Sequence, residues 1–140
     1  MHKSATSVDE YLEGLEGESG EAIRALDLLI HPLLNGLSRT LWEGVFRGGT
    51  EQQIIGYGDL VQTRSRGIEV EWFLIGLATQ KNYLSLYVNA VEDGEYLGQQ
   101  FAASIGASKV GDSSLSFARF EDIDLDVLTD LIIRARASVG

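Results

Sequence analysis

The sequence predicts an α+β fold: a curved antiparallel β-meander of about five to six strands, with N- and C-terminal helices packed on one face. Three observations lead to this expectation. Both ends of the chain place apolar residues at helical spacing, whereas residues 37–88 are rich in aromatic and β-branched residues. Short turns separate the central strands, and connections this short join antiparallel neighbours. Helices flanking a central meander are typical of the α+β class.

The first part of the chain predicts two helices. Ser7 and Glu10 form a capping-box pattern, which starts a helix over residues 8–15. Three glycines then interrupt the pattern, and Ser19 is expected to open a second helix. Because Pro32 has no N–H to donate, this helix is expected to kink or finish there. Its apolar stripe consists of Ile23, Leu26, Leu29, Ile30 and Leu33.

The central part predicts the strands of the meander. The main strands are expected over residues 39–46, 52–59, 69–78 and 83–88. Residues 60–63 either continue the second strand or form a short third one after a bend. In the strand over 69–78, alternation places Val70, Trp72 and Leu74 on one face and Phe73 on the other.

The last part predicts a third helix over residues 95–104, a short strand over 115–120 and a closing helix over 125–137. Asp124 precedes the closing helix and is expected to be its N-cap. Residues 1–6 are expected to form a mobile terminus. All 140 residues are expected to form a single domain.

Composition narrows the classes of function. The chain has 21 acidic residues against 11 Lys and Arg, so its formal net charge is −10. A nucleic-acid backbone would meet an unfavourable long-range field, and we expect no nucleic-acid partner. No apolar run is long enough to span a bilayer, so no membrane partner is expected. The chain has no cysteine, which fits a reducing compartment, and we expect a cytoplasmic location.

Motifs of known catalytic and cofactor sites are incomplete, and the sequence predicts no catalytic residue. Residues 56–58 resemble the start of a dinucleotide fingerprint, but Val61 stands where its third glycine belongs. Aspartates in residues 122–126 resemble a calcium loop, but Ile133 occupies the position of its bidentate glutamate. His31 lacks partners at ligand spacing, which favours a packing role. A site made of carboxylates alone stays open.

Aromatic residues on the expected strands are the candidates for ligand binding. Neighbouring strands can gather them into a platform on the sheet, where a small molecule or a peptide binds. Packing in the core is the alternative. The candidate ligand-binding residues are Trp42, Phe46, Tyr57 and Trp72.

Acidic residues of the first helix are the candidates for metal binding. Carboxylate oxygens suit hard or borderline cations, including Fe(II), and a weak exposed site needs no histidine or cysteine. A solvated helix face is the alternative. The candidate metal ligands are Asp9, Glu10 and Glu13, and weakly bound Fe(II) is the one cofactor considered.

Several strings of residues, in order along nearly the whole chain, resemble the YdhG-like family of small bacterial domains of unknown function. They are Ser-Val-Asp-Glu-Tyr-Leu at 7–12, Lys-Asn-Tyr-Leu-Ser-Leu-Tyr at 81–87, Ser-Leu-Ser-Phe at 114–117 and Glu-Asp-Ile-Asp at 121–124. Many members carry an aromatic-Gly-Met-Pro stretch where Val45 and Phe46 follow Gly44 here. Part of the family is labelled a frataxin-like iron chaperone, which the resemblance makes an alternative here.

Two functions follow as expectations. The first is a non-enzymatic cytoplasmic binding or interaction module that uses the concave or helix-free sheet surface and its aromatic rim, with an unknown small molecule or protein as its partner. The second is an iron-binding or iron-delivery protein that resembles frataxin in its weak carboxylate sites. A homodimer is a further option, because an uncovered edge strand or sheet face would favour self-association.

Overall fold

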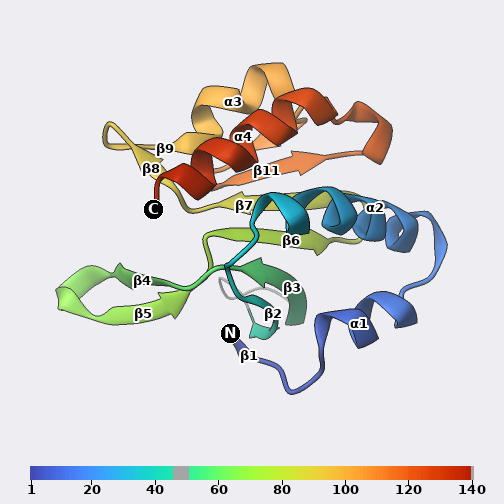
Figure 1. The fold of residues 1–140 in the computed structure, drawn as a ribbon, viewed down its shortest axis with the longest axis horizontal. Coiled ribbons are helices and arrows are strands. Elements are labelled where there is room, and N and C mark those ends of the chain that lie inside the picture. Colours follow the sequence, from blue (N-terminus) through green and yellow to red (C-terminus); the bar gives the residue numbers. More distant parts are fainter. Residues whose placement is uncertain (46–50, 140) are drawn as a thin grey trace.

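An antiparallel sheet runs through the computed structural model, which describes residues 1–45 and 51–139 (Figure 1). Its seven strands in these residues are, in spatial order, β1 (His2–Lys3), β2 (Arg39–Val45), β3 (Glu51–Tyr57), β6 (Ile75–Thr79), β7 (Leu84–Val88), β11 (Ser114–Phe117) and β10 (Lys109–Val110). The predicted α+β class and antiparallel pairing are confirmed. Five to six strands were expected. The two-residue edge strands β1 and β10 are too short to show the alternation from which strands are predicted.

Helices cover one face of this sheet. The described part of the chain contains α1 (Val8–Gly14), α2 (Gly17–Leu33), α3 (Leu97–Ile105) and α4 (Leu125–Ala137). Contacts join α2 to β6, α3 to β7 and β11, and α4 to both α2 and α3. In Figure 1, α2 and α4 are both drawn in front of the strands. None of the described helices combines the length and apolar character needed to cross a membrane.

The ends of the helices follow the predicted capping residues, with one exception. The Ser7 hydroxyl accepts from the Glu10 N–H at the start of α1, and the Asp124 carboxylate accepts from two N–H groups at the start of α4. As expected, α2 finishes just after Pro32. It begins at Gly17, however, two residues before Ser19. Gly20 thus lies inside the helix, where a Cβ atom would come within 3.0 Å of Leu15.

Two hydrophobic clusters lie on opposite faces of the sheet. The larger, helix-side core buries Leu84, Leu86 and Val88 of β7 against the helices, together with Ile23 and Ile30 of α2. The smaller aromatic cluster lies on the helix-free face. It consists of Trp42, Ile54, Trp72, Phe73, Ala78 and Tyr87.

The prediction of one continuous strand over 69–78 is wrong, because this segment forms two separate strands. Strand β5 (Glu69–Trp72) pairs with β4 (Leu60–Thr63) in a separate two-stranded ribbon, and β6 joins the main sheet. Phe73 packs with Trp72 in the aromatic cluster, while Leu74 enters the helix-side core. The expected alternation of faces therefore fails at the point where the chain leaves the ribbon and enters the sheet.

Two further segments differ from their predicted structure. Residues Glu95–Tyr96 form β9, which pairs with β8 (Val91–Glu92) in a tight hairpin, so the third helix begins at Leu97. Residues 1–6 were predicted to be a mobile terminus, but His2–Lys3 forms strand β1 beside β2. In both cases a two-residue pairing decides the structure, and pairings this short leave no periodic pattern.

Candidate functional site

Aromatic rings pack against one another on the helix-free face of the sheet. The ring centroids of Trp42 and Trp72 are 5.4 Å apart in an edge-on arrangement, and Trp72 stacks on Phe73 at 4.3 Å. Phe73 also meets Tyr87 edge-on at 6.2 Å. Such pairs add about 0.5–1.5 kcal/mol beyond the burial of their surface. The rings thus form a packed layer.

The predicted ligand-binding residues do not share one surface. Trp42 and Trp72 come together in the aromatic cluster, but each exposes less than a tenth of its surface because the rings cover one another. Tyr57 is in the helix-side core on the other face of the sheet. Phe46 lies outside the described residues. In place of the expected open platform the described rings form a packed layer, and of the described candidates Trp42, Tyr57 and Trp72, it is Trp72 that lines a cavity.

That cavity is a groove of about 710 Å³ beside the β4–β5 ribbon, here called the ribbon groove. In Figure 1 the ribbon projects away from the sheet, and the β8–β9 hairpin projects on the same side. The groove is lined by residues 60–64 and 70–72 of the ribbon, by Val91 and Tyr96 of the β8–β9 hairpin, and by Met1, Val45, Asn89 and Ser113.

The ribbon groove has an apolar rim and a fixed floor. Val45, Val61 and Val91 are 57%, 65% and 54% exposed, although they come from three different strands. At the floor, the buried Asn89 amide donates to the Phe73 carbonyl at 2.7 Å, which holds the turn that carries Trp72. This arrangement suits recognition of a ligand with both apolar and hydrogen-bonding groups.

Charge in the lining is sparse. Among the described lining residues, Arg64 and Glu71 have the charged side chains, and the Arg64 guanidinium lies 5.8 Å from the centre of the Trp72 ring. Stacking on an aromatic face is a common arrangement for arginine. The groove therefore presents mainly valine side chains, amides and hydroxyls to a ligand.

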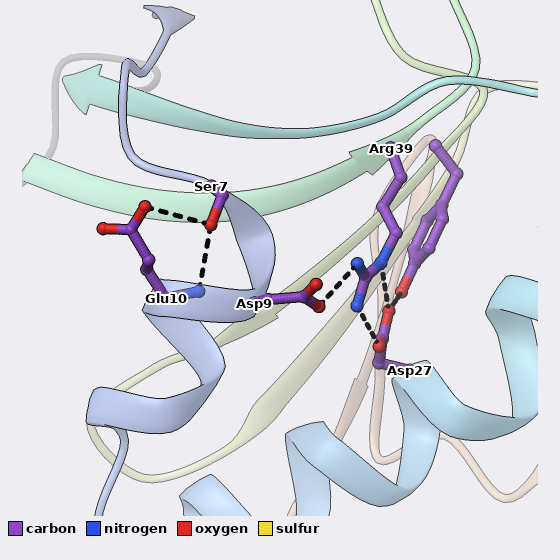
Figure 2. Close-up of polar contacts among 6 residues, drawn as sticks. Ser7, Asp9, Glu10, Asp27 and Arg39 are labelled. Carbon is purple, nitrogen blue, oxygen red and sulfur yellow. Dashed lines mark hydrogen bonds and ion pairs between the residues drawn. The ribbon is translucent and has the colours of Figure 1, made fainter.

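A polar network lies on the other face of the sheet, between α1, α2 and β2 (Figure 2). Asp27 of α2 is buried, and its carboxylate accepts two hydrogen bonds from the Arg39 guanidinium, at 3.0 and 2.5 Å. The Tyr57 hydroxyl donates to the same carboxylate at 2.5 Å. Arg39 also donates to Asp9 of α1 at 3.0 Å. One guanidinium thus ties both N-terminal helices to the sheet.

The network is suited to holding structure. Burial, and then the neighbouring Asp27 carboxylate, raise the pKa of Tyr57 well above its ordinary range, so the phenol keeps its proton near neutral pH. The pKa of Arg39 is also raised, chiefly by its hydrogen bond to Asp27.

Asp27 was not predicted from the sequence as a functional or structural residue, although the sequence contains a signal for it. It lies four residues after Ile23 and three before Ile30, so helical spacing places it in the apolar stripe.

Two of the three predicted metal ligands bind other side chains of the protein. Asp9 is bound to Arg39, and the Glu10 carboxylate accepts from the Ser7 hydroxyl at 3.3 Å (Figure 2). Glu13 is exposed on α1. Within residues 1–45 and 51–139, no group of three or more His, Asp or Glu side chains is placed to hold a metal ion. The Fe(II) site stays a prediction, and two of its three ligands would have to exchange partners.

A second hollow of about 560 Å³ separates α2 from the β6–β7 turn. Its lining includes Glu18 and Glu21 of α2 together with Lys81 and Arg119, so charges of both signs are mixed there.

Comparisons of the chain with protein-family models, curated proteins and solved structures gave no match.

Proposed function

We propose that this protein is a non-enzymatic binding module and that the ribbon groove is its recognition site. One observation carries this proposal: three strands that are separate in the sequence each place an exposed valine around the same groove, beside the Trp72 ring. Isolated exposed valines are ordinary, but a set that surrounds one cavity is typical of an interaction site.

The floor of the groove supports this assignment. Trp72 is held by Trp42 and Phe73, and the Asn89 amide fixes the Phe73 carbonyl. Because this wall is already ordered in the free protein, its side chains lose less conformational entropy when a ligand binds. The described lining of the second hollow includes one exposed large hydrophobic side chain, that of Tyr83, together with charged residues of both signs.

Membership of the YdhG-like family and a cytoplasmic location are part of the same proposal. The strings at 7–12, 81–87, 114–117 and 121–124 support the first. The antiparallel sheet with helices at both chain ends agrees with the fold that the resemblance implies. The frataxin-like function is the alternative. The contacts of Asp9 and Glu10 do not favour it, because both carboxylates already bind other side chains.

A fragment screen by heteronuclear NMR tests the site. Uncharged aromatic and aliphatic fragments should shift the backbone signals of residues 60–64, Val91 and Tyr96 more than those around the second hollow. Val91→Arg places a charge on the apolar rim and should weaken the best fragments about tenfold. Ile133→Arg is the matched control, because Ile133 is similarly exposed, at 49%, on α4. Fragments that gather at the second hollow, or that bind the Val91→Arg variant as well as the wild type, would show that the proposed site is wrong.

A further inference from the structure

One backbone edge of strand β4 has no paired strand within residues 1–45 and 51–139. In this part of the chain β4 pairs with β5 alone, and the Arg64 N–H donates to the Ile68 carbonyl at 2.7 Å. In an antiparallel pair, residues bonded across the ladder alternate with residues that are not. The N–H and C=O groups of Val61 and Thr63 therefore point away from β5. Across the described residues, no backbone hydrogen bond joins these groups to a further strand.

The two edges of the ribbon differ in their protection. Proteins usually place charges or prolines on edge strands that must stay unpaired. On β5, the outward-pointing backbone groups belong to Glu69 and Glu71, which are both charged and exposed. Strand β4 reads Leu-Val-Gln-Thr and carries neither a charge nor a proline. The β4 edge is therefore open to pairing, whereas the β5 edge is guarded.

The open edge borders the ribbon groove. All of residues 60–64 line it, and Val91 and Tyr96 line it from the β8–β9 hairpin. In Figure 1, β4 is the strand of the ribbon nearer to β8 and β9. An extended segment paired along the four residues of β4 would span about 13 Å. Its side chains would alternate between the groove and the outer face of the ribbon.

Charge selects the kind of segment. Glu69 and Glu71 lie on the ribbon, and Asp93 and Glu95 are exposed on the β8–β9 hairpin. The basic side chains of residues 60–72 are Arg66, which is exposed at the turn, and Arg64, whose guanidinium lies over the Trp72 ring, and the protein as a whole carries a charge of −10. A basic segment is steered toward such a surface, and an acidic one is repelled.

We infer that the ribbon groove takes an extended segment of a partner protein, with Lys or Arg at alternate positions, which adds to β4 as a further strand. Main-chain hydrogen bonds to Val61 and Thr63 supply the pairing, and the surrounding carboxylates select the basic side chains. This inference rests on the proposed function, since it names the partner of the same groove.

The probe is an acetylated and amidated seven-residue peptide in which Lys alternates with Thr and Val. Titrated into the isotopically labelled protein, it should shift the signals of residues 60–64 and slow hydrogen exchange at the Val61 and Thr63 amides about tenfold or more. The same peptide with Glu in place of Lys, and a version N-methylated at every residue, should each bind about tenfold more weakly. Equal binding of either version would overturn the inference.

A matched pair of proline variants tests the edge. Thr63 and Glu69 lie opposite each other, and their N–H groups point to opposite edges of the ribbon, so a proline at either position breaks no bond within it. Thr63→Pro should weaken the probe about tenfold, whereas Glu69→Pro should change its affinity about threefold or less, through the lost charge. The opposite order would assign the segment to β5.

Failures of the two proposals are distinguishable. If fragments bind the groove but the peptide does not protect Val61 and Thr63, the binding module stands and strand addition is wrong. If neither binds, both are wrong. Protection of the same amides that depends on protein concentration, without peptide, would assign the β4 edge to a second copy of the chain instead.

Discussion

Gly56 lies directly opposite Gly76 in the pairing of β3 with β6, and aromatic rings occupy the space above both residues. A Cβ atom on Gly56 would come within 2.6 Å of the Trp42 ring, and one on Gly76 within 2.3 Å of the Phe73 ring. The pair of glycines thus allows the aromatic layer to lie against the sheet, and this layer forms the floor under Trp72.

Gly76→Ala should destabilise the protein by about 1–3 kcal/mol, because the added methyl group forces the Phe73 ring out of its packed position. Chemical denaturation measures the free energy of unfolding. The fluorescence of Trp72, which stacks on Phe73, should change as well. Gly98→Ala in α3 is the control, since its Cβ would meet nothing closer than 3.5 Å. A Gly76→Ala variant as stable as Gly98→Ala would contradict this account of the layer.

Arg39→Met should destabilise the protein by about 3–5 kcal/mol, because it leaves the buried Asp27 carboxylate without its cationic partner. Lys3→Met breaks an exposed ion pair with Asp59 and should cost no more than about 1 kcal/mol. The double variant Asp27→Leu with Arg39→Met should recover part of the loss, since no buried charge remains and the remaining cost is that of the Tyr57 hydroxyl, which loses its acceptor. Denaturation curves of the three variants measure the free energy of unfolding. A double variant that loses the sum of the two single losses would show that Asp27 and Arg39 do not act as a pair.

Tyr57→Phe should flatten the fall in stability at alkaline pH. Because the pKa of Tyr57 is raised in the folded protein, the unfolded chain ionises first as the pH rises. The contribution of the group is therefore complete below about pH 10, its ordinary value, and is lost as the pH rises toward the folded-state pKa. Thermal unfolding between neutral and strongly alkaline pH measures the slope.

Some alkaline slope should persist in that variant, since the pKa values of Tyr11 and Lys3 are raised as well, that of Tyr11 by burial and that of Lys3 chiefly by its hydrogen bond to Asp59. An unchanged slope would mean that Tyr57 ionises as readily in the folded protein as in the unfolded chain.

Fe(II) titration under anaerobic conditions should show no saturable micromolar binding, because Asp9 and Glu10 already bind Arg39 and Ser7. Isothermal titration calorimetry measures this directly. The frataxin-like alternative makes the opposite prediction, namely micromolar binding that is reduced by Asp9→Ala combined with Glu13→Ala. Saturable binding that the double variant reduces would therefore replace the binding module with an iron-binding protein.

Local signals in the sequence were sufficient for much of the fold. The capping residues Ser7 and Asp124 predicted the starts of α1 and α4, since a side chain and the first turn it caps are neighbours in the chain. Short turns between alternating segments predicted antiparallel pairing, because only antiparallel neighbours can be joined that closely. Half of the candidate ligand-binding set, Trp42 and Trp72, also came together as expected.

Tertiary structure alone decided the site. Alternation shows which residues of a strand share a face, but not which face meets the helices. The sequence therefore could not show that Tyr57 lies on the helix side with Asp27, on the face opposite to Trp72. Nor does alternation show where a strand leaves the sheet, which at Phe73 separates the β4–β5 ribbon from the meander and opens the groove. These choices depend on contacts between segments distant in the chain, and the pattern within any one segment does not contain them.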